Sequence, residues 1–471
     1  MAPEPSVCWQ AVHSRDARFD GRFFAGATTT RVYCRSICPV PFARPHNIVW
    51  FASAAAAESA GFRPCRRCRS AASPGTPAWI GTSAVVSRAM RLIAEGALDG
   101  GDTTALAERV GLGPRHLRRL FVEHLGASPT RIAITRRVHF ARNLIEETTL
   151  PITELAACAG FRSIRQFNHA MRSATGESPT ELRRLKRVAR GATHQPGLLI
   201  RLPYRPPFHW AGMLAFLGSR AIAGVETVRD GVYRRTVEIG GVTGVIGVQP
   251  DRAEHQLLIN LELPRYESLM AVVERVRRMF DLAADPCQIA DHLSRDQILR
   301  PLLAVHPGLR VAGIWDGFEA AVRAIVGERL ADQTRRAALA RLARTFGRPL
   351  TQITPDLLYS FPNPQDLAEA NLATVGIGRE LASTIHALAR SVLKGDLTFE
   401  ASMNREDAIA RLRIVRGINR HMAEYIAMRA FSEPDAFPIA SDRAPADGGD
   451  AWRPWRAYAA MYLWSDYQLR V

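Results

Sequence analysis

Hydrophobic positions change their spacing several times along the chain, and these changes divide it into segments. Residues 1–72 show little helical periodicity, whereas apolar residues recur at helical spacing over 83–190. Short β-rich runs surround two helical patterns over 198–285, and helical periodicity returns over 286–471. A linker rich in Pro, Gly and Ser, residues 70–77, marks the first boundary. The pattern predicts a domain for each segment, in a multidomain protein that is mainly α-helical with α+β parts.

A chain of 471 residues is too long for one hydrophobic core of ordinary size, so we expect several domains. The hydrophobic fraction of 47% is typical of folded domains. The formal net charge is +17, and residues 1–190 carry +14 of it, from 28 Lys and Arg against 14 Asp and Glu. Such a basic stretch needs a polyanion or a membrane surface as partner. No run of about 18 apolar residues occurs, and the N-terminus lacks the regions of a signal peptide. We therefore expect a cytoplasmic protein with no membrane partner.

Four of the seven cysteines form two close pairs, Cys34 with Cys38 and Cys65 with Cys68. In a reducing cytoplasm, clustered cysteines more often bind metal or react than form disulfides. Two close pairs separated by a longer loop can place four sulfur atoms tetrahedrally around Zn²⁺. Two interpretations follow. Spacing alone favours a structural zinc site, whereas the arginines that crowd both pairs favour a metal site working beside a polyanion.

The residues around these cysteines resemble the N-terminal domain of the Ada DNA-alkylation response proteins. The similarity is carried by residues 16–24, 29–39 and 61–68. The sequence departs from the family pattern at residues 36–37, which lie in the loop between Cys34 and Cys38 and are not ligands. The resemblance implies that Cys34 accepts a methyl group from a methylated DNA phosphate, with the other three cysteines as remaining zinc ligands. Methylating one thiolate removes a negative charge beside many arginines, so affinity for DNA phosphates should rise and repair becomes a signal.

The second segment contains a degenerate internal repeat. Residues 104–121 are echoed by residues 153–167, and each copy is followed by Ser-Pro-Thr. Gly111 and Gly160 fall where a tight turn between helices needs a positive φ. The repeat resembles the paired helix-turn-helix modules of AraC-type regulators, which implies DNA binding, although for any single arginine a solvated face is an equally good interpretation. The implied base or phosphate contacts are Arg115, Arg118, Ser163, Arg165 and Gln166.

The C-terminal half carries a third set of motifs. Residues 320–327, 412–429, 434–438 and 452–458 resemble the AlkA type of 3-methyladenine DNA glycosylase, and residues 198–285 resemble its N-terminal α+β domain. In that family a helix-hairpin-helix holds the DNA backbone, and the damaged nucleotide is flipped out. The implied site residues are Gly417 and Asn419 in the hairpin, Tyr425 and Trp464 in the base pocket, and Asp442 as the catalytic carboxylate. Without the resemblance, aromatic residues at helical spacing are more often core than pocket.

This half also departs from the glycosylase pattern. The hairpin ends in Asn419 where the family has Gly, and we expect the turn to survive because Asn tolerates positive φ. His421 stands where the family commonly has Trp, and Arg329 replaces the residue that wedges into the DNA stack. One extra residue precedes Asp442, and the stretch after it is short and contains Pro and Gly. We therefore expect the helix that normally begins at this Asp to be missing.

Together these resemblances imply a fused DNA-alkylation response protein with Zn²⁺ as cofactor. It would transfer methyl groups from DNA methylphosphotriesters to Cys34, activate transcription, and excise alkylated purines of the 3-methyladenine type. The expected partners are double-stranded DNA, alkylated DNA and RNA polymerase. One alternative is a sequence-specific transcriptional regulator with a degenerate, non-catalytic glycosylase-like domain. Another is a plain base-excision enzyme with a basic N-terminal anchor.

Overall fold

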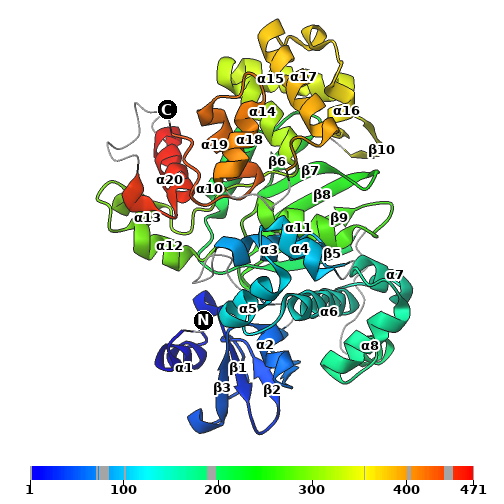
Figure 1. Cartoon of the computed structure of the whole chain (residues 1–471), viewed down its shortest axis with the longest axis vertical. Helices are drawn as coiled ribbons and strands as arrows, with labels where there is room; N and C mark the ends of the chain where they lie inside the picture. Colours follow the sequence, from blue (N-terminus) through cyan, green and yellow to red (C-terminus); the bar gives the residue numbers. More distant parts are fainter. Residues whose placement is uncertain are drawn as a thin grey trace.

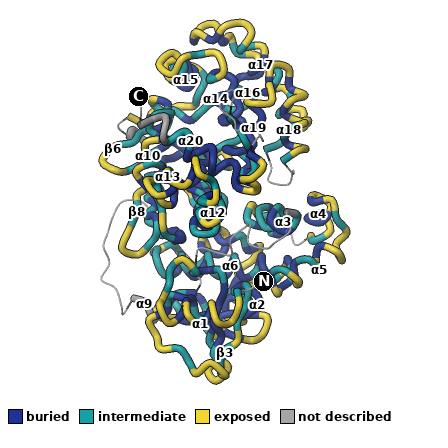
Figure 2. Tube along the Cα trace, turned by 90° about the vertical axis from the view of Figure 1, so that its left-hand side faces the viewer, coloured by how far each residue is buried: buried dark blue, intermediate teal, exposed yellow. Residues whose placement is uncertain are grey.

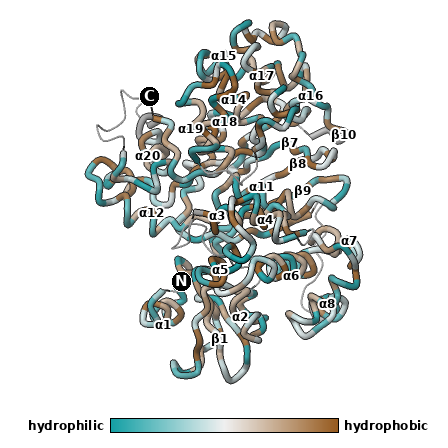
Figure 3. The backbone as a smooth tube through the Cα atoms, viewed as in Figure 1, coloured by the Kyte–Doolittle hydropathy of each residue, from teal (hydrophilic) through white to brown (hydrophobic). Residues whose placement is uncertain are grey.

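The structure is a computed structural model that describes residues 3–70, 73, 84–99, 102–187, 198–354, 356–399, 405–439 and 449–469. The N-terminal strands lie at one end of the molecule, a five-stranded sheet lies near its middle, and the later helices form the other end (Figure 1). Buried positions run through the centre of each part, and exposed positions mark the outer turns (Figure 2). Hydrophobic and hydrophilic residues are interspersed along the chain (Figure 3). No described helix is long and apolar enough to cross a membrane.

A small four-stranded sheet carries the N-terminal cysteines. Its part of the chain contains α1 (Pro5–His13), β1 (Phe24–Ala27), β2 (Val32–Cys34), β3 (Ile48–Phe51), α2 (Ala54–Ser59) and β4 (Arg63–Pro64), with 3-10 turns at Ala17–Phe19 and Pro45–Asn47. The strands lie in the order β3-β1-β2-β4, and β2 pairs with β4 in parallel while the other pairs are antiparallel. Phe23, Phe24 and Tyr33 are at most 1% exposed and supply much of the small core.

The repeat folds into two similar helical units. The helices are α3 (Ala84–Ala94), α4 (Thr103–Arg109), α5 (Pro114–Leu125), α6 (Pro129–Glu147), α7 (Ile152–Cys158), α8 (Ile164–Thr175) and α9 (Pro179–Arg187). Gly111 between α4 and α5 has φ +76°, and Gly160 between α7 and α8 has φ +73°, as the two tight turns require. In α5 the residues Leu117, Phe121 and Leu125 are buried, so one face at four-residue spacing packs inward. The predicted pair of helix-turn-helix units is therefore present, with α6 connecting them.

A five-stranded antiparallel sheet follows. It consists of β5 (Leu198–Pro203), β6 (Glu226–Arg229), β7 (Val232–Ile239), β8 (Val242–Asp251) and β9 (Gln256–Glu262), accompanied by α10 (Trp210–Ser219) and α11 (Leu269–Met279). The strand order is β5-β9-β8-β7-β6. In β9 the alternate residues Leu257, Ile259 and Leu261 are fully buried, because successive side chains point to opposite faces of a strand. The predicted small α+β part is present.

The rest of the chain is mainly helical. Its elements are α12 (Pro286–Leu293), α13 (Leu299–Val305), α14 (Gly317–Arg329), α15 (Asp332–Phe346), β10 (Pro349–Thr354), β11 (Leu357–Tyr359), α16 (Pro364–Leu367), α17 (Arg379–Lys394), α18 (Arg405–Ile414), α19 (Arg420–Ala430) and α20 (Arg456–Leu469), with 3-10 turns at Leu372–Val375 and Asp450–Trp452. Helix α14 begins where the Asp316 carboxylate accepts hydrogen bonds from the amides of Phe318 and Glu319. Most of α14 is buried, and it packs against α17 and α19.

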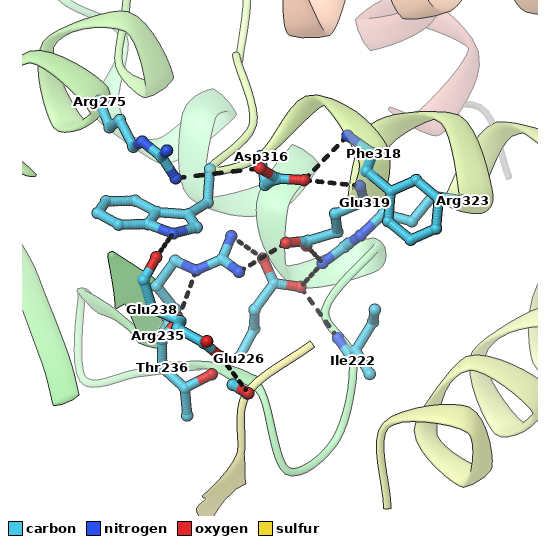
Figure 4. Close-up of polar contacts among 12 residues, drawn as sticks. Ile222, Glu226, Arg235, Thr236, Glu238, Arg275, Asp316, Phe318, Glu319 and Arg323 are labelled. Carbon is cyan, nitrogen blue, oxygen red and sulfur yellow. Dashed lines mark hydrogen bonds and ion pairs between the residues drawn. The ribbon is translucent and has the colours of Figure 1, made fainter. Parts of the chain in front are cut away.

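A buried ion-pair network joins the five-stranded sheet to α14 (Figure 4). Arg235 on β7 lies between Glu226 and Glu319, with its Nη2 2.8 Å from Glu319 Oε2. Arg323, one turn after Glu319 on α14, pairs with the same two carboxylates. The Tyr233 hydroxyl donates to Glu226 at 2.6 Å. Two guanidinium groups thus balance two buried carboxylates and hold the sheet against the helix.

Polar contacts also connect the earlier parts of the chain to the sheet. Arg136 on α6 pairs with Glu274 on α11 at 2.8 Å and donates to the Ala94 carbonyl at 2.6 Å. Arg22, near the N-terminal sheet, lies 3.3 Å from Asp285. The N-terminal sheet and the repeat helices are therefore packed against the rest of the described structure.

Candidate zinc centre and DNA-binding surfaces

The four cysteines of the spacing pattern converge, and their Sγ atoms all lie within 4.8 Å of one another. Cys34 is the last residue of β2, and Cys65 directly follows β4. These strands pair in parallel, Tyr33 opposite Pro64, which brings the two cysteines side by side. Four sulfur ligands at this spacing fit tetrahedral Zn²⁺. Within the described residues, this is the one cluster of at least three side chains able to hold a metal ion.

Neighbouring groups orient the sulfur atoms. The Arg35 amide donates to Cys68 Sγ at 3.5 Å, and the Arg35 guanidinium donates to the Cys68 carbonyl at 3.1 Å. The same buried guanidinium pairs with Asp20, its Nε 2.8 Å from Oδ1. The donation from the Arg35 amide favours the thiolate form of Cys68, and thiolates are the form that binds a metal.

Cys34 differs from the other three cysteines in exposure. Cys38, Cys65 and Cys68 are 0%, 8% and 7% exposed, whereas Cys34 is half-buried. Cys34, which the sequence predicts to be the methyl acceptor, is therefore the least buried residue of the four. The exposed arginines next to the ligands in sequence are Arg31, Arg63, Arg66 and Arg67.

The residues predicted to contact DNA lie on α5 and at the start of α8. Arg115, Arg118, Arg165 and Gln166 are exposed, which leaves their side chains accessible to a duplex. Ser163 is also exposed, but it caps α8, and its Oγ accepts a hydrogen bond from the Gln166 amide at 3.2 Å. The hydroxyl of Ser163 therefore has a structural role in the helix start. Contacts of these residues with DNA stay a prediction.

The hairpin between α18 and α19 is formed, but not in the way that we expected. Gly417 takes the positive φ, +95°, and a Cβ there would lie 2.1 Å from Thr384 Oγ1. Asn419 has φ −85° and caps α19, accepting a hydrogen bond from the Met422 amide at 2.8 Å. Its amide nitrogen also donates to Glu328. Asn419 thus preserves the hairpin as a helix cap, and the expectation that it would adopt positive φ was wrong.

The two aromatic residues predicted for a base pocket lie together. The ring centroids of Tyr425 and Trp464 are 6.3 Å apart, and Phe216 of α10 stacks on Trp464 at 6.4 Å and 16°. Sequence reasoning missed Phe216, because nothing local in the sequence indicates that α10 packs against α20. Tyr425 also lines a cavity of about 160 Å³ together with Arg220, Arg323, Arg335, His421 and Arg429.

Arginines dominate the electrostatics of this cavity. The Arg429 Nη1 donates to the Tyr425 hydroxyl at 2.6 Å. Burial alone raises the pKa of Tyr425, but Arg429, Arg220 and Arg323 outweigh it and lower the pKa to about 8. The Arg220 guanidinium lies 3.9 Å from the Phe216 ring centroid, and that of Arg429 lies 5.6 Å from the Tyr425 centroid. Cations of the protein itself therefore cover faces of the aromatic rings.

The remaining residues of the predicted glycosylase pattern are Asp442, Arg329 and His421. Asp442, and the helix expected to be missing there, lie outside the described residues. Arg329 ends α14 with a side chain that is 62% exposed, and its Nη2 lies 2.9 Å from Glu380 Oε1. His421 is exposed on α19.

Comparison with known proteins finds family models that match three parts of the chain. Family models match for the metal binding domain of Ada over residues 7–70, a helix-turn-helix domain over 106–185 and the AlkA N-terminal domain over 199–316. A probable bifunctional transcriptional activator/DNA repair enzyme AlkA of Mycobacterium tuberculosis is 39% identical over 478 residues, covering 97% of this chain and 95% of the relative.

Two further comparisons each cover more than half of this chain. DNA-3-methyladenine glycosylase 2 of Escherichia coli is 33% identical over 277 residues, covering 56% of this chain and 95% of its own. The structure of a 3-methyladenine DNA glycosylase from Archaeoglobus fulgidus aligns with a TM-score of 0.50 and 19% identity, over 57% of this chain and 98% of that one. The latter likeness shows the fold.

The class of protein is now defined: a DNA-repair protein and a transcriptional regulator are joined in one chain. Because the Mycobacterium tuberculosis relative matches over nearly its whole length, the chain belongs to the family of bifunctional transcriptional activator/DNA repair enzymes. The cysteine cluster is the zinc centre of its Ada-type metal binding domain.

Proposed function

We propose that the chain removes methyl groups from methylated DNA phosphates and that Cys34 is the acceptor. The observation that carries this proposal is the half-buried position of Cys34 beside three buried cysteines. Its thiolate attacks the methyl carbon, a sulfur–carbon bond forms, and the carbon–oxygen bond breaks to release a phosphodiester anion. Zinc, when bound, keeps the thiolates deprotonated at neutral pH. A methylphosphotriester is locally uncharged, so it can approach the anionic cluster without strong repulsion.

Methylation would also serve as the signal for transcription. The cluster loses one negative charge, so the exposed arginines around it hold DNA phosphates more tightly, with a strong dependence on salt. The exposed residues of α5 and α8 would then read promoter DNA through the helix-turn-helix units. We propose double-stranded and alkylated DNA as the partners, RNA polymerase as the partner in activation, and the cytoplasm as location. The proposed domains are 1–72, 83–190, 198–285 and 286–471.

We propose that the last two domains excise alkylated purines of the 3-methyladenine type. Amides of the hairpin at Gly417 and Asn419 would hold the DNA backbone, and Tyr425 and Trp464 would stack on a flipped base. Asp442 would stabilise the oxocarbenium-like sugar or activate water. The formed hairpin and the grouped aromatic rings support this proposal.

A second candidate is favoured by the arginines at the pocket. A cationic alkylated base binds aromatic rings through cation–π attraction. Here it would compete with Arg220 and Arg429 for the same ring faces, and it would be repelled by their charge. This observation favours a sequence-specific transcriptional regulator with a degenerate, non-catalytic glycosylase-like domain.

Transfer of radiolabelled methyl from phosphate-methylated DNA tests the acceptor. We expect label on the protein, and its loss in Cys34→Ser. Cys287→Ser is the matched control, because Cys287 is also half-buried but lies outside the cluster. Absence of labelled protein, or label that persists in Cys34→Ser, would contradict the assignment. A plain base-excision enzyme with a basic anchor predicts no labelled protein at all.

Release of methylated purines from alkylated DNA separates the two candidates for the C-terminal half. If it is a glycosylase, release is expected from the wild type and lost in Asp442→Asn. Asp450→Asn is the control, since Asp450 pairs with Arg453 at an exposed position nearby. No release from protein that still binds zinc and DNA would establish the regulator with a non-catalytic domain.

A further inference from the structure

Helix α2 lies between the zinc centre and the repeat helices, and its Glu58 is buried, with 7% exposure. The Tyr33 hydroxyl donates to Glu58 Oε1 at 3.0 Å, and His139 Nε2 lies 2.9 Å from the same oxygen. The Thr135 hydroxyl donates to Glu58 Oε2 at 2.6 Å. Tyr33 belongs to β2, whereas Thr135 and His139 belong to α6. One carboxylate thus joins the strand that ends in Cys34 to the helix that connects the two helix-turn-helix units.

The contacts of Glu58 are those of a charged group. Burial raises the pKa of Glu58, but His139, Thr135 and Tyr33 outweigh burial and keep this pKa below its usual value. A buried carboxylate that loses a hydrogen-bond partner is penalised strongly, because no water replaces the donor. Tyr33, Glu58 and the two α6 side chains are therefore expected to shift together and not singly.

At the zinc end, the main chain of Tyr33 lies between the two halves of the cluster. Its carbonyl accepts hydrogen bonds from the Cys65 amide and from the Ser70 hydroxyl, each at 3.0 Å. Cys34 is the next residue. A methyl group added to Cys34 Sγ takes up space beside three buried cysteines, so we expect neighbouring atoms to move. Tyr33, which precedes Cys34 in β2, is therefore close to this change, and its hydroxyl donates to Glu58.

At the other end, α2 also touches the first helix-turn-helix unit. The Ser53 hydroxyl donates to the carbonyl of Leu125, the last residue of α5, at 2.7 Å. A Cβ built on the following residue, Gly126, would lie 2.9 Å from the Ala56 Cβ, so α2 and this turn are in close contact. A displacement of α2 would therefore reach α5 and α6 together.

We propose that Glu58 is a positioning residue that transmits the methylation state of Cys34 to α6, and so to the relative placement of α5 and α8. This inference rests on the proposed methyl transfer to Cys34. Methylation would then act in two ways. The loss of charge acts on DNA directly and is screened by salt, and the conformational change passes through Glu58 to α6. The conformational route differs from the electrostatic one in a testable way, because it changes α6 in the absence of DNA.

Amide hydrogen exchange of the full zinc-loaded chain tests the proposal. Exchange is measured over α6 before and after Cys34 is methylated. One sample is methylated by phosphate-methylated DNA, which is then removed, and a separate sample is methylated by methyl iodide. Peptide mass identifies the methylated residue in each sample. In the wild type we expect α6 exchange rates to change by about fivefold or more, the scale of ordinary allosteric coupling. In Glu58→Gln and in Tyr33→Phe this change should be lost, while the change around residues 34–38 remains.

Glu177→Gln is the matched control. Glu177 also connects α8 and α9 to the N-terminal sheet, through an ion pair with Arg66. The side chains of Arg66 and Glu177 are 64% and 22% exposed, and the pair does not involve Tyr33. The control should retain the wild-type response in α6. An unchanged α6 in the methylated wild type, or an equal response in Tyr33→Phe, would overturn the proposal. If Glu58→Gln fails to fold, Tyr33→Phe decides alone. If DNA transfers no methyl group to Cys34, the proposed function fails instead, and the methyl iodide arm still tests the coupling.

Discussion

Replacing Arg235 with Met would break the buried network that holds the five-stranded sheet against α14. The side chain of Arg235 is 1% exposed and lies between Glu226 and Glu319, whose side chains are 4% and 1% exposed. Without it, Arg323 is the one guanidinium of this network left to balance two buried carboxylates. Removing one partner of a buried pair costs about 3–5 kcal/mol, because it leaves an uncompensated charge. We expect Arg235→Met to lower the free energy of unfolding by that amount.

Urea unfolding of the full chain, followed by tryptophan fluorescence, measures the loss. Trp315 is a local reporter, since its ring centroid lies 5.7 Å from the Arg235 guanidinium carbon. The double variant Arg235→Met/Glu319→Gln removes one charge of each sign and should cost less than the two single variants summed. Arg348→Met is the surface control, because its ion pair with Glu238 is 51% exposed on the arginine side and should contribute less than about 1 kcal/mol. An Arg235→Met loss as small as that control would refute the reasoning.

The same network predicts a dependence on pH. Burial raises the pKa of Glu226, but Arg323 and Arg235 outweigh burial and lower the pKa to about 2. A glutamate in an unfolded chain has a pKa of about 4.3. The contribution of Glu226 to stability is therefore complete above about pH 4.3 and is lost as pH falls toward 2. Arg235→Met should raise this pKa and move the midpoint of acid unfolding to higher pH; an unchanged midpoint would count against the assignment.

Three other expectations concern the hairpin, the pocket and the metal. Gly417→Ala should lower the free energy of unfolding by about 1–2 kcal/mol or more and weaken binding to an abasic duplex, because Gly417 has φ +95° and the new Cβ would meet Thr384. Urea unfolding and a binding titration measure the two effects. A loss of stability no larger than that of Gly113→Ala, where a Cβ meets nothing, would contradict this expectation. The phenol of Tyr425 should ionise near pH 8 in ultraviolet titration, and Arg429→Met should raise the pKa of this phenol. Because an unfolded tyrosine ionises at about pH 10, the contribution of Tyr425 to the free energy of unfolding should grow between pH 8 and about 10. Zinc removal by a chelator should make the four clustered thiols reactive toward a thiol reagent; equal reactivity with and without chelator would argue against bound zinc.

Much of the local structure follows from short-range patterns. The amphipathic spacing of Leu117, Phe121 and Leu125 predicts a helix with one buried face, and α5 has it. Gly111 and Gly160 are needed at two equivalent turns, and both take positive φ there. These features depend on neighbours within a few residues, which is why periodicity and turn chemistry predict them.

The sequence by itself determined the kinds of element, the two cysteine pairs and the family of the chain. The tertiary structure alone decided which distant residues meet: Phe216 with Trp464, Arg235 with Glu319, and Glu58 with His139. It also decided that Gly417, and not Asn419, takes the positive φ of the hairpin, because Asn419 caps α19 instead. The physical reason is common to all of them. Such contacts depend on how the packed faces of separate helices and strands come together, and no local period in the sequence encodes that packing.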